Sequence, residues 1–152
     1  MNNNIKFIMS RKLLRYGVLL FLLGLITGFA LPAMANSRMG LSSHLEGVMN
    51  GMFLILLGLL WSKLNLSERN LKWGYGLSLY GTYINWATTL IAALFGAGSE
   101  MMPIAGGGME GTIWQEVMIK FGLISLSISM LIVCGLLLWG LRGSSFDTNH
   151  SV

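Results

Sequence analysis

Four long apolar runs divide this sequence and restrict what it can fold into. They cover about 13–33, 44–64, 73–95 and 117–141, and each reaches the roughly 20 residues that a helix needs to cross a bilayer. Of the 152 residues, 54% are hydrophobic and only 11% are charged, a balance that is unusual for a soluble globular domain. The sequence therefore predicts an all-α integral membrane protein, a four-transmembrane-helix bundle in one domain of residues 1–142. We expect the polar tail, residues 143–152, to be disordered.

Basic residues gather on one side of the predicted spans. Outside the runs they are Lys6, Arg11, Lys12 and Arg15 before the first, Lys63, Arg69 and Lys72 between the second and third, and Arg142 after the fourth. The other two loops hold only Arg38, and Lys120 opens the fourth span, where it can reach the interface or pair with Glu116. The positive-inside rule then places both termini in the cytoplasm, and we expect a bacterial inner membrane. These charges are topology signals, so nucleic acid is not an expected partner.

The N-terminal segment admits a second interpretation. Basic residues, an apolar core and the sequence Ala-Met-Ala at 33–35 together fit a secretory signal with a cleavage site. However, the apolar run is long for the core of such a signal. Its removal would also leave three spans, so we favour an uncleaved first helix.

A polar stretch opens the second predicted span. Polar groups at membrane depth are costly and suggest a function, and here they are His44, Glu46 and Asn50. A helix advances about 100° per residue, so Gly47 and Gly51 fall within roughly 60° of His44, whereas Glu46 and Asn50 share a second face. The glycine stripe predicts either a helix–helix seam or a surface on which a flat ligand, such as a porphyrin, lies beside the imidazole.

His44 is the candidate metal ligand of this stretch. We expect it in the first turn of its helix, where the positive end of the helix dipole disfavours imidazolium and keeps a lone pair available. The other histidine, His150, lies in the polar tail, so a haem would have one protein histidine per chain. Glu46 has two interpretations. The spacing of Ser43 and Glu46 fits a capping box at the start of the helix, and the alternative is a role in the site.

The third predicted span carries a row of polar residues on one helical face. They are Ser78, Thr82, Asn85 and Thr89, which step by four, three and four positions, and Tyr80 and Tyr83 lie beside or opposite this row. The hydroxyl groups are most simply explained by hydrogen bonds between helices. Asn85 is the stronger site candidate, because an amide can make four hydrogen bonds and a packing contact seldom provides them all.

Two further segments bear on how the helices pack. The first span contains Gly24 and Gly28, a small-xxx-small pair that predicts a close approach by another helix. The segment 98–110 is too polar to span the membrane and too apolar to be a simple linker, and we expect it to fold back over the outer mouth as a lid.

Three runs of the sequence form a distinctive pattern. Residues 44–52 read His-Leu-Glu-Gly-Val-Met-Asn-Gly-Met, residues 80–86 read Tyr-Gly-Thr-Tyr-Ile-Asn-Trp, and residues 102–105 read Met-Pro-Ile-Ala. This pattern closely resembles the hydroxylaminobenzene mutases and, more distantly, the styrene oxide isomerases. The resemblance extends over about 14–139 and implies a four-helix membrane isomerase.

The resemblance also implies a cofactor and an assembly. In the epoxide isomerases the motif histidine binds haem b at a subunit interface of a homotrimer, and the motif asparagine lines the substrate pocket. Carried over, these residues are His44 and Asn50, and Asn85 matches a second asparagine. His44 would then be the metal ligand, with Gly47 and Gly51 as cofactor-binding residues, in a homo-oligomer embedded in the lipid bilayer.

The chemistry implied by the resemblance is a rearrangement of a small aromatic substrate. A ferric haem acts as a Lewis acid on an N-hydroxyarylamine, giving a 2-aminophenol, with Asn50 and Asn85 orienting the substrate oxygen and Tyr80 or Tyr83 as acid or aromatic wall. The alternative is isomerisation of an aryl epoxide to an aldehyde, but Thr89 and Gly81 stand where the epoxide isomerases have a Tyr and an Asp. A small transporter and a membrane anchor subunit remain as non-enzymatic alternatives.

Overall fold

The structure, a computed structural model, describes residues 3–142 and consists of helices joined by short connections. Its four long helices in this range are α1 (Asn3–Ala30), α2 (Ser37–Leu60), α3 (Glu68–Phe95) and α5 (Ile113–Gly140). Between them lie two 3₁₀ turns, η1 (Leu31–Ala33) and η2 (Trp61–Lys63), and the short helix α4 (Pro103–Gly106). The described residues contain no strand, so the all-α prediction is confirmed. The predicted disordered tail, residues 143–152, lies outside the described residues.

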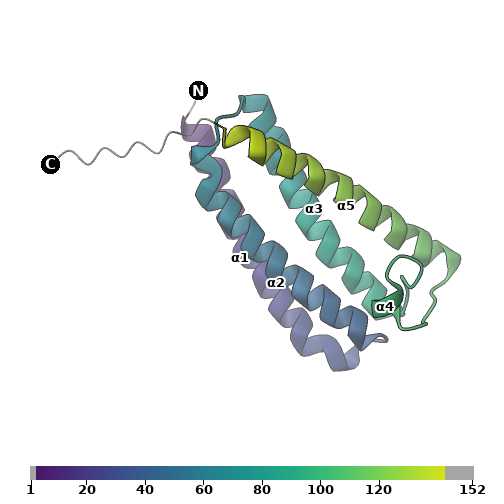
Figure 1. Ribbon diagram of the computed structural model, residues 1–152. Coiled ribbons are helices and arrows are strands. Elements are labelled where there is room, and N and C mark those ends of the chain that lie inside the picture. Colours follow the sequence, from purple (N-terminus) through teal and green to yellow (C-terminus); the bar gives the residue numbers. More distant parts are fainter. Residues whose placement is uncertain (1–2, 143–152) are drawn as a thin grey trace.

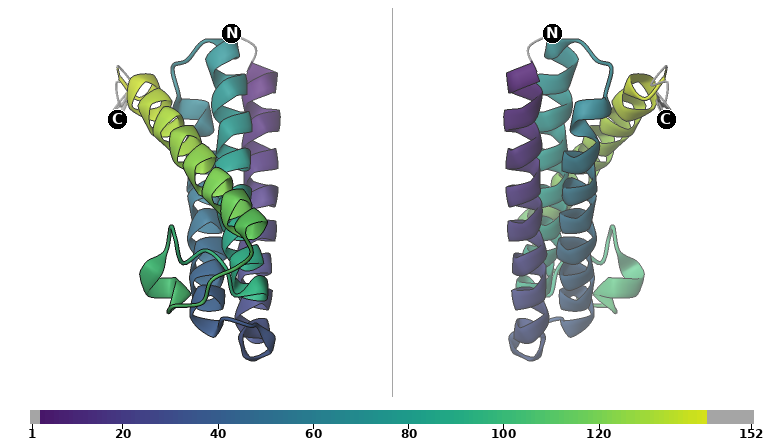
Figure 2. Two further views of the ribbon diagram at one scale, coloured as in Figure 1. Left: turned by 90° about the vertical axis from the view of Figure 1, so that its right-hand side faces the viewer. Right: turned by 90° about the vertical axis from the view of Figure 1, so that its left-hand side faces the viewer.

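Helix α3 is the central helix of the bundle. It contacts α1, α2 and α5, whereas α5 packs mainly on α3 and crosses it obliquely (Figures 1 and 2). The first turn of α1, the connection between α2 and α3, and the last turn of α5 lie at one end of the bundle, and α4 lies at the other end (Figure 1). The start of α1 and the end of α5 are therefore on the same side.

Three helices within residues 3–142 are long and apolar enough to cross a membrane. They are α1 continued by η1 (Asn3–Ala33), α2 continued by η2 (Ser37–Lys63), and α5 (Ile113–Gly140). Helix α3, expected as the third of four spans, is not among them, because its polar side chains lower its hydropathy. Its 28 residues nevertheless give it a length of about 42 Å, more than the roughly 30 Å of a hydrocarbon core.

Helix α2 begins earlier than the apolar run indicated. Asn36 is its N-cap, and the Asn36 side chain accepts hydrogen bonds from the backbone N–H groups of Arg38 and Met39. The predicted capping box of Ser43 and Glu46 is therefore wrong. His44 lies in the third turn of α2, where the field of the helix dipole no longer acts on its ring as it would in the first turn.

The other long helices also extend beyond their apolar runs. Ser67 caps α3, and Thr112 and Gln115 form a capping box at the start of α5. Helix α3 ends at Phe95 and is capped by Gly96, whose positive φ of 63° suits a residue without a Cβ atom. Polar residues at the ends of the helices are good helix formers or caps, so the helices are longer than the apolar stretches within them.

The loop between α3 and α5 is fastened to the start of α2. The Asn36 Nδ2 atom donates to the carbonyl oxygens of Ala105 (3.2 Å) and Gly106 (2.9 Å), both in α4. In the third turn of α5, Lys120 pairs with Glu100 and not with Glu116. The loop thus lies against the α1–α2 connection at this end of the bundle.

Glycines bring α1 and α2 into close contact. A Cβ atom on Gly24 would lie 2.6 Å from the backbone nitrogen of Val48, and one on Gly51 would lie 2.6 Å from that of Phe21. Neither distance is compatible with a side chain larger than hydrogen. The close approach predicted from Gly24 and Gly28 is therefore confirmed.

Candidate functional site

His44 is fixed by a hydrogen bond to the neighbouring helix. Its Nδ1 atom lies 2.8 Å from the carbonyl oxygen of Gly24 in α1. A carbonyl oxygen only accepts, so Nδ1 carries the proton, and in the neutral ring Nε2 keeps its lone pair. A metal-binding histidine typically donates its other ring N–H to a carbonyl in this way. The half-buried His44 ring thus fits a metal ligand.

The glycine stripe beside His44 forms the seam with α1. A Cβ atom on Gly47 would lie only 2.9 Å from Cδ1 of Trp86, and Gly24 lies directly against Gly47. Gly47 and Gly51 are both buried. Helix α1 thus covers the stripe, and the chain leaves no room for a flat ligand against these two glycines.

Glu46 gathers both asparagines predicted for the site. The Nδ2 atom of Asn50, one turn further along α2, donates to Oε2 of Glu46 at 3.1 Å. Asn85 of α3 donates from its Nδ2 atom to the same carboxylate oxygen. All three side chains are half-buried. The structure therefore forms a polar cluster of Glu46, Asn50 and Asn85 between two helices, which we call the Glu46 cluster.

The Glu46 cluster and His44 lie on different faces of α2. His44 turns toward Gly24 and Gly28 of α1, whereas the Glu46 cluster lies on the side of α3. The sequence placed Glu46 and Asn50 on one face away from His44, and the structure has this arrangement. Within one described chain the imidazole and the amides therefore face different neighbours.

The serine and threonine hydroxyl groups of the predicted polar row on α3 are hydrogen-bonded within their own helix, and not between helices as expected. Ser78 donates to the carbonyl oxygen of Gly74 at 2.6 Å, and Thr82 donates to that of Ser78 at 2.7 Å. Thr89 donates to the carbonyl oxygens of Asn85 and Trp86. The three side chains are almost fully buried. They complete the interior of the bundle and do not join the Glu46 cluster.

The tyrosine candidates do not join the Glu46 cluster either. The hydroxyl oxygen of Tyr80 lies 2.8 Å from Oγ of Ser125 in α5, and the Tyr83 hydroxyl donates to the carbonyl oxygen of Tyr16 in α1 at 2.9 Å. Their hydroxyl groups are thus bonded to α5 and α1, and not to the Glu46 cluster.

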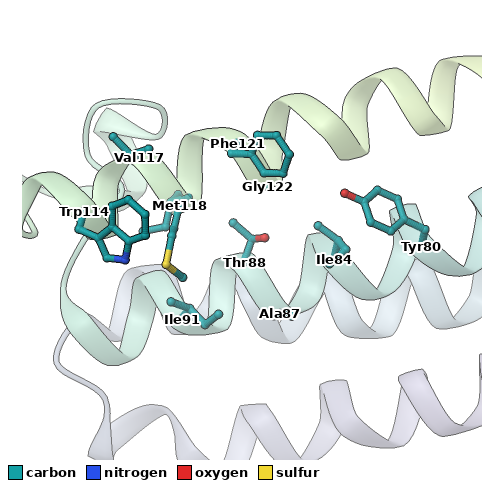
Figure 3. Close-up of a pocket in the computed structure, with 11 residues that line it drawn as sticks. Tyr80, Ile84, Ala87, Thr88, Ile91, Trp114, Val117, Met118, Phe121 and Gly122 are labelled. Atoms are coloured by element: carbon teal, nitrogen blue, oxygen red, sulfur yellow. The ribbon is translucent and has the colours of Figure 1, made fainter.

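An apolar pocket of about 440 Å³ lies between α3 and α5 (Figure 3). The pocket walls include the Tyr80 ring, the Thr88 hydroxyl and two exposed aromatic side chains, Trp114 and Phe121. Neither His44 nor the Glu46 cluster contributes to these walls. This pocket therefore carries none of the imidazole, carboxylate and amide groups described above.

Trp86 is the residue near His44 whose importance the sequence did not reveal. Its indole Nε1 donates to Oγ1 of Thr27 in α1 at 3.1 Å, and its carbonyl oxygen accepts from Ser43 in α2 at 3.2 Å. It thereby joins the three helices beside the imidazole. Its place in the middle of the predicted third span was the signal that the sequence offered.

The fold and the site define a small helical membrane protein. Between its helices lie an imidazole, a carboxylate and two amides, which are groups that enzymes use in catalysis. A family model described as styrene oxide isomerase matches residues 9–142. The chain belongs to the styrene oxide isomerase family, and it is an isomerase.

Two curated relatives are similar over most of the chain. The hydroxylaminobenzene mutase HabB of Ectopseudomonas oleovorans is 60% identical over 141 residues, which are 93% of this chain and 86% of HabB. The hydroxylaminobenzene mutase HabA of the same organism is 42% identical over 133 residues, 88% of this chain and 98% of HabA. No solved structure matches the chain.

Proposed function

We propose that this isomerase rearranges N-hydroxyarylamines, such as hydroxylaminobenzene, to 2-aminophenols. The observation that carries the proposal is the Glu46 cluster, in which a carboxylate holds two amides among apolar helices. The names of the two mutase relatives supply the substrate class. Apolar aromatic substrates partition into a bilayer, which suits a site between membrane helices.

The proposal includes a four-span topology with both termini in the cytoplasm of a bacterium. Helix α3 would be the remaining span, with its polar side chains turned inward and Ser78 and Thr82 fully buried. The start of α1 and the end of α5 lie at one end of the bundle (Figure 1), as an even number of crossings requires. Most basic residues belong to this end, which the positive-inside rule assigns to the cytoplasm.

His44 would hold a haem b through Nε2. The Nδ1 hydrogen bond to Gly24 fits this role, because it leaves Nε2 unprotonated in the neutral ring. A ferric haem would supply Lewis acidity toward the substrate oxygen. Since Gly47 and Gly51 are covered by α1, the haem would meet other surfaces of the protein.

Asn50 and Asn85 would orient the substrate oxygen. Each amide has two N–H bonds and uses one for Glu46, so each keeps one to donate. In the reaction the N–O bond breaks and a C–O bond forms at the ortho carbon. A proton leaves that carbon and one is added to nitrogen, so the product is an isomer. The surrounding apolar helices would exclude water from the cationic intermediate.

The two faces of α2 support a homo-oligomer. His44 and the Glu46 cluster face different neighbours within one chain, so a substrate that meets both would lie between two copies. A trimer is the state that the family resemblance suggests.

Isomerisation of aryl epoxides is the second candidate, because the family model carries that description. The two positions that match the epoxide-binding Tyr and Asp argue against it. Thr89 uses its hydroxyl within α3, and Gly81 packs against Met130 and Ser129 of α5. Neither position offers a group to an epoxide oxygen.

The test is turnover by membranes that contain the chain, combined with a haem spectrum of the purified protein. We expect conversion of hydroxylaminobenzene to 2-aminophenol and a Soret band that is lost or shifted in His44→Ala but not in His150→Ala. Absence of turnover of either substrate class by haem-loaded protein would overturn the isomerase assignment. Full haem binding by His44→Ala would overturn the ligand. Protein without haem would favour a transporter or an anchor subunit.

A further inference from the structure

Glu46 has a second carboxylate oxygen that the cluster does not use. Both asparagines donate to Oε2, and within residues 3–142 no hydrogen bond is made to Oε1. An accessible acceptor that no donor occupies can accept a hydrogen bond from a ligand, and in an apolar surrounding that bond adds to the affinity.

The orientation of the two amides determines what lies around this free oxygen. A carboxylate oxygen only accepts, so Asn50 and Asn85 each turn the NH₂ side of the amide toward Glu46. The remaining N–H bonds of the amides therefore lie close to the carboxylate. A substrate oxygen held by these N–H bonds has its neighbouring atoms next to Glu46.

N-hydroxyarylamines and aryl epoxides differ in whether they can donate a hydrogen bond to Oε1 of Glu46. An N-hydroxyarylamine carries an N–H bond on the atom directly attached to its oxygen. An epoxide has no hydrogen on a polar atom. A site that hydrogen-bonds a substrate N–H rejects an analogue that lacks it, because the acceptor of the site is then left unpaired.

We infer that Glu46 is the specificity-determining residue of this isomerase, because its free Oε1 atom accepts the N–H bond of an N-hydroxyarylamine whose oxygen is held by Asn50 and Asn85. This inference rests on the proposed function and adds to it a reason for the preference over epoxides. Glu46 also keeps both amides in place, so its two oxygens have separate tasks. Oε2 orients the two amides, and Oε1 accepts the hydrogen bond from the substrate N–H.

The experiment combines a change in the protein with a change in the substrate. Hydroxylaminobenzene and N-methyl-N-phenylhydroxylamine, which lacks the N–H bond, are compared in haem-loaded wild type, Glu46→Gln and Glu68→Gln. Glu68 is the matched control, because it is an exposed carboxylate at the start of α3 that pairs with Lys72. The quantity measured is the ratio of kcat/KM for the two substrates.

We expect wild type and Glu68→Gln to prefer hydroxylaminobenzene by at least about 30-fold, and Glu46→Gln to reduce this preference by about ten-fold or more. Glu46→Asp, which keeps a carboxylate, should retain part of the preference and serves as the second variant if Glu46→Gln does not fold. A structural role of Glu46 would lower both kcat/KM values equally. An unchanged ratio in a folded Glu46→Gln protein overturns the inference, whereas failure of wild type to turn over hydroxylaminobenzene overturns the proposed function.

Discussion

His44 and Gly24 are joined across the α1–α2 seam by a 2.8 Å hydrogen bond from the imidazole Nδ1 to the carbonyl oxygen. The seam is close enough for this bond because glycines occupy both helices. A Cβ atom on Gly28 would lie 2.8 Å from the same Nδ1 atom. The position of the imidazole and the packing of the helices therefore depend on one another.

The tautomer of His44 follows directly from this bond. In haem-free protein at neutral pH we expect the proton on Nδ1, because the Gly24 carbonyl can only accept. Nitrogen NMR of protein with ¹⁵N-labelled histidine distinguishes the two tautomers, and His150→Ala removes the only other histidine signal. A neutral ring with its proton on Nε2 would contradict the structure.

Filling the seam should destabilise the fold. In Gly24→Ala the new Cβ atom would lie 2.6 Å from Val48 N and 2.7 Å from Gly47 C, both backbone atoms that cannot move independently. We expect a loss of about 1–3 kcal/mol in the free energy of unfolding, as for other overpacked sites. Thermal unfolding in detergent measures it.

Gly76→Ala is the control for this substitution, because a Cβ atom there meets nothing within 4 Å. Alanine should raise the stability of α3 by about 0.5–1 kcal/mol through helix propensity. Equal effects of the two substitutions would show that the seam is not packed as described.

Asn36 has two tasks that different substitutions can separate. Its Oδ1 atom caps α2, and its Nδ2 atom holds the carbonyl oxygens of Ala105 and Gly106. Asn36→Asp should keep the cap and release α4, whereas Asn36→Ala should also lose the cap, at a cost of about 0.5–2 kcal/mol. Hydrogen exchange of residues 103–107 and of 37–40 reports the two effects separately. Protection of 103–107 in Asn36→Asp as in wild type would refute the first assignment.

The contact between Glu46 and Asn85 predicts a rescue. Asn85→Asp places a second carboxylate against Glu46 Oε2, so repulsion and the lost hydrogen bond should lower the thermal stability. Adding Glu46→Gln restores an amide–carboxylate pair with the two partners exchanged. We expect the double variant to be more stable than Asn85→Asp alone, with a coupling of about 1 kcal/mol or more. Additive effects of the two substitutions would mean that the side chains are not in contact.

The sequence predicted the long helices but not where they begin. Apolar runs report the part of a helix that suits hydrocarbon, and segments such as 3–12 and 37–43 continue the helices with polar residues. Asn36 is a better guide to the start of α2 than the first apolar residue. The capping box of Ser43 and Glu46 was wrong because both residues are already helical neighbours inside α2.

The candidate site was predictable where it depends on one helix. Glu46 and Asn50 are four positions apart, so helical periodicity alone brings them together. The contact of Asn85 with Glu46 depends on how far α3 is shifted and rotated against α2, which periodicity within α3 does not determine. For the same reason the sequence left open whether Gly47 and Gly51 meet a ligand or a helix, and only the placement of α1 decides between them.

The serine and threonine row of α3 has a consequence for how the protein is inserted during synthesis. Ser78, Thr82 and Thr89 donate to carbonyl oxygens of their own helix, so in the proposed four-span topology these groups are already satisfied when α3 enters lipid alone. Asn85 needs a partner from outside α3, and Glu46 belongs to α2, which the ribosome makes first. Glu46 is therefore already present when Asn85, which requires it as a hydrogen-bond partner, is synthesised.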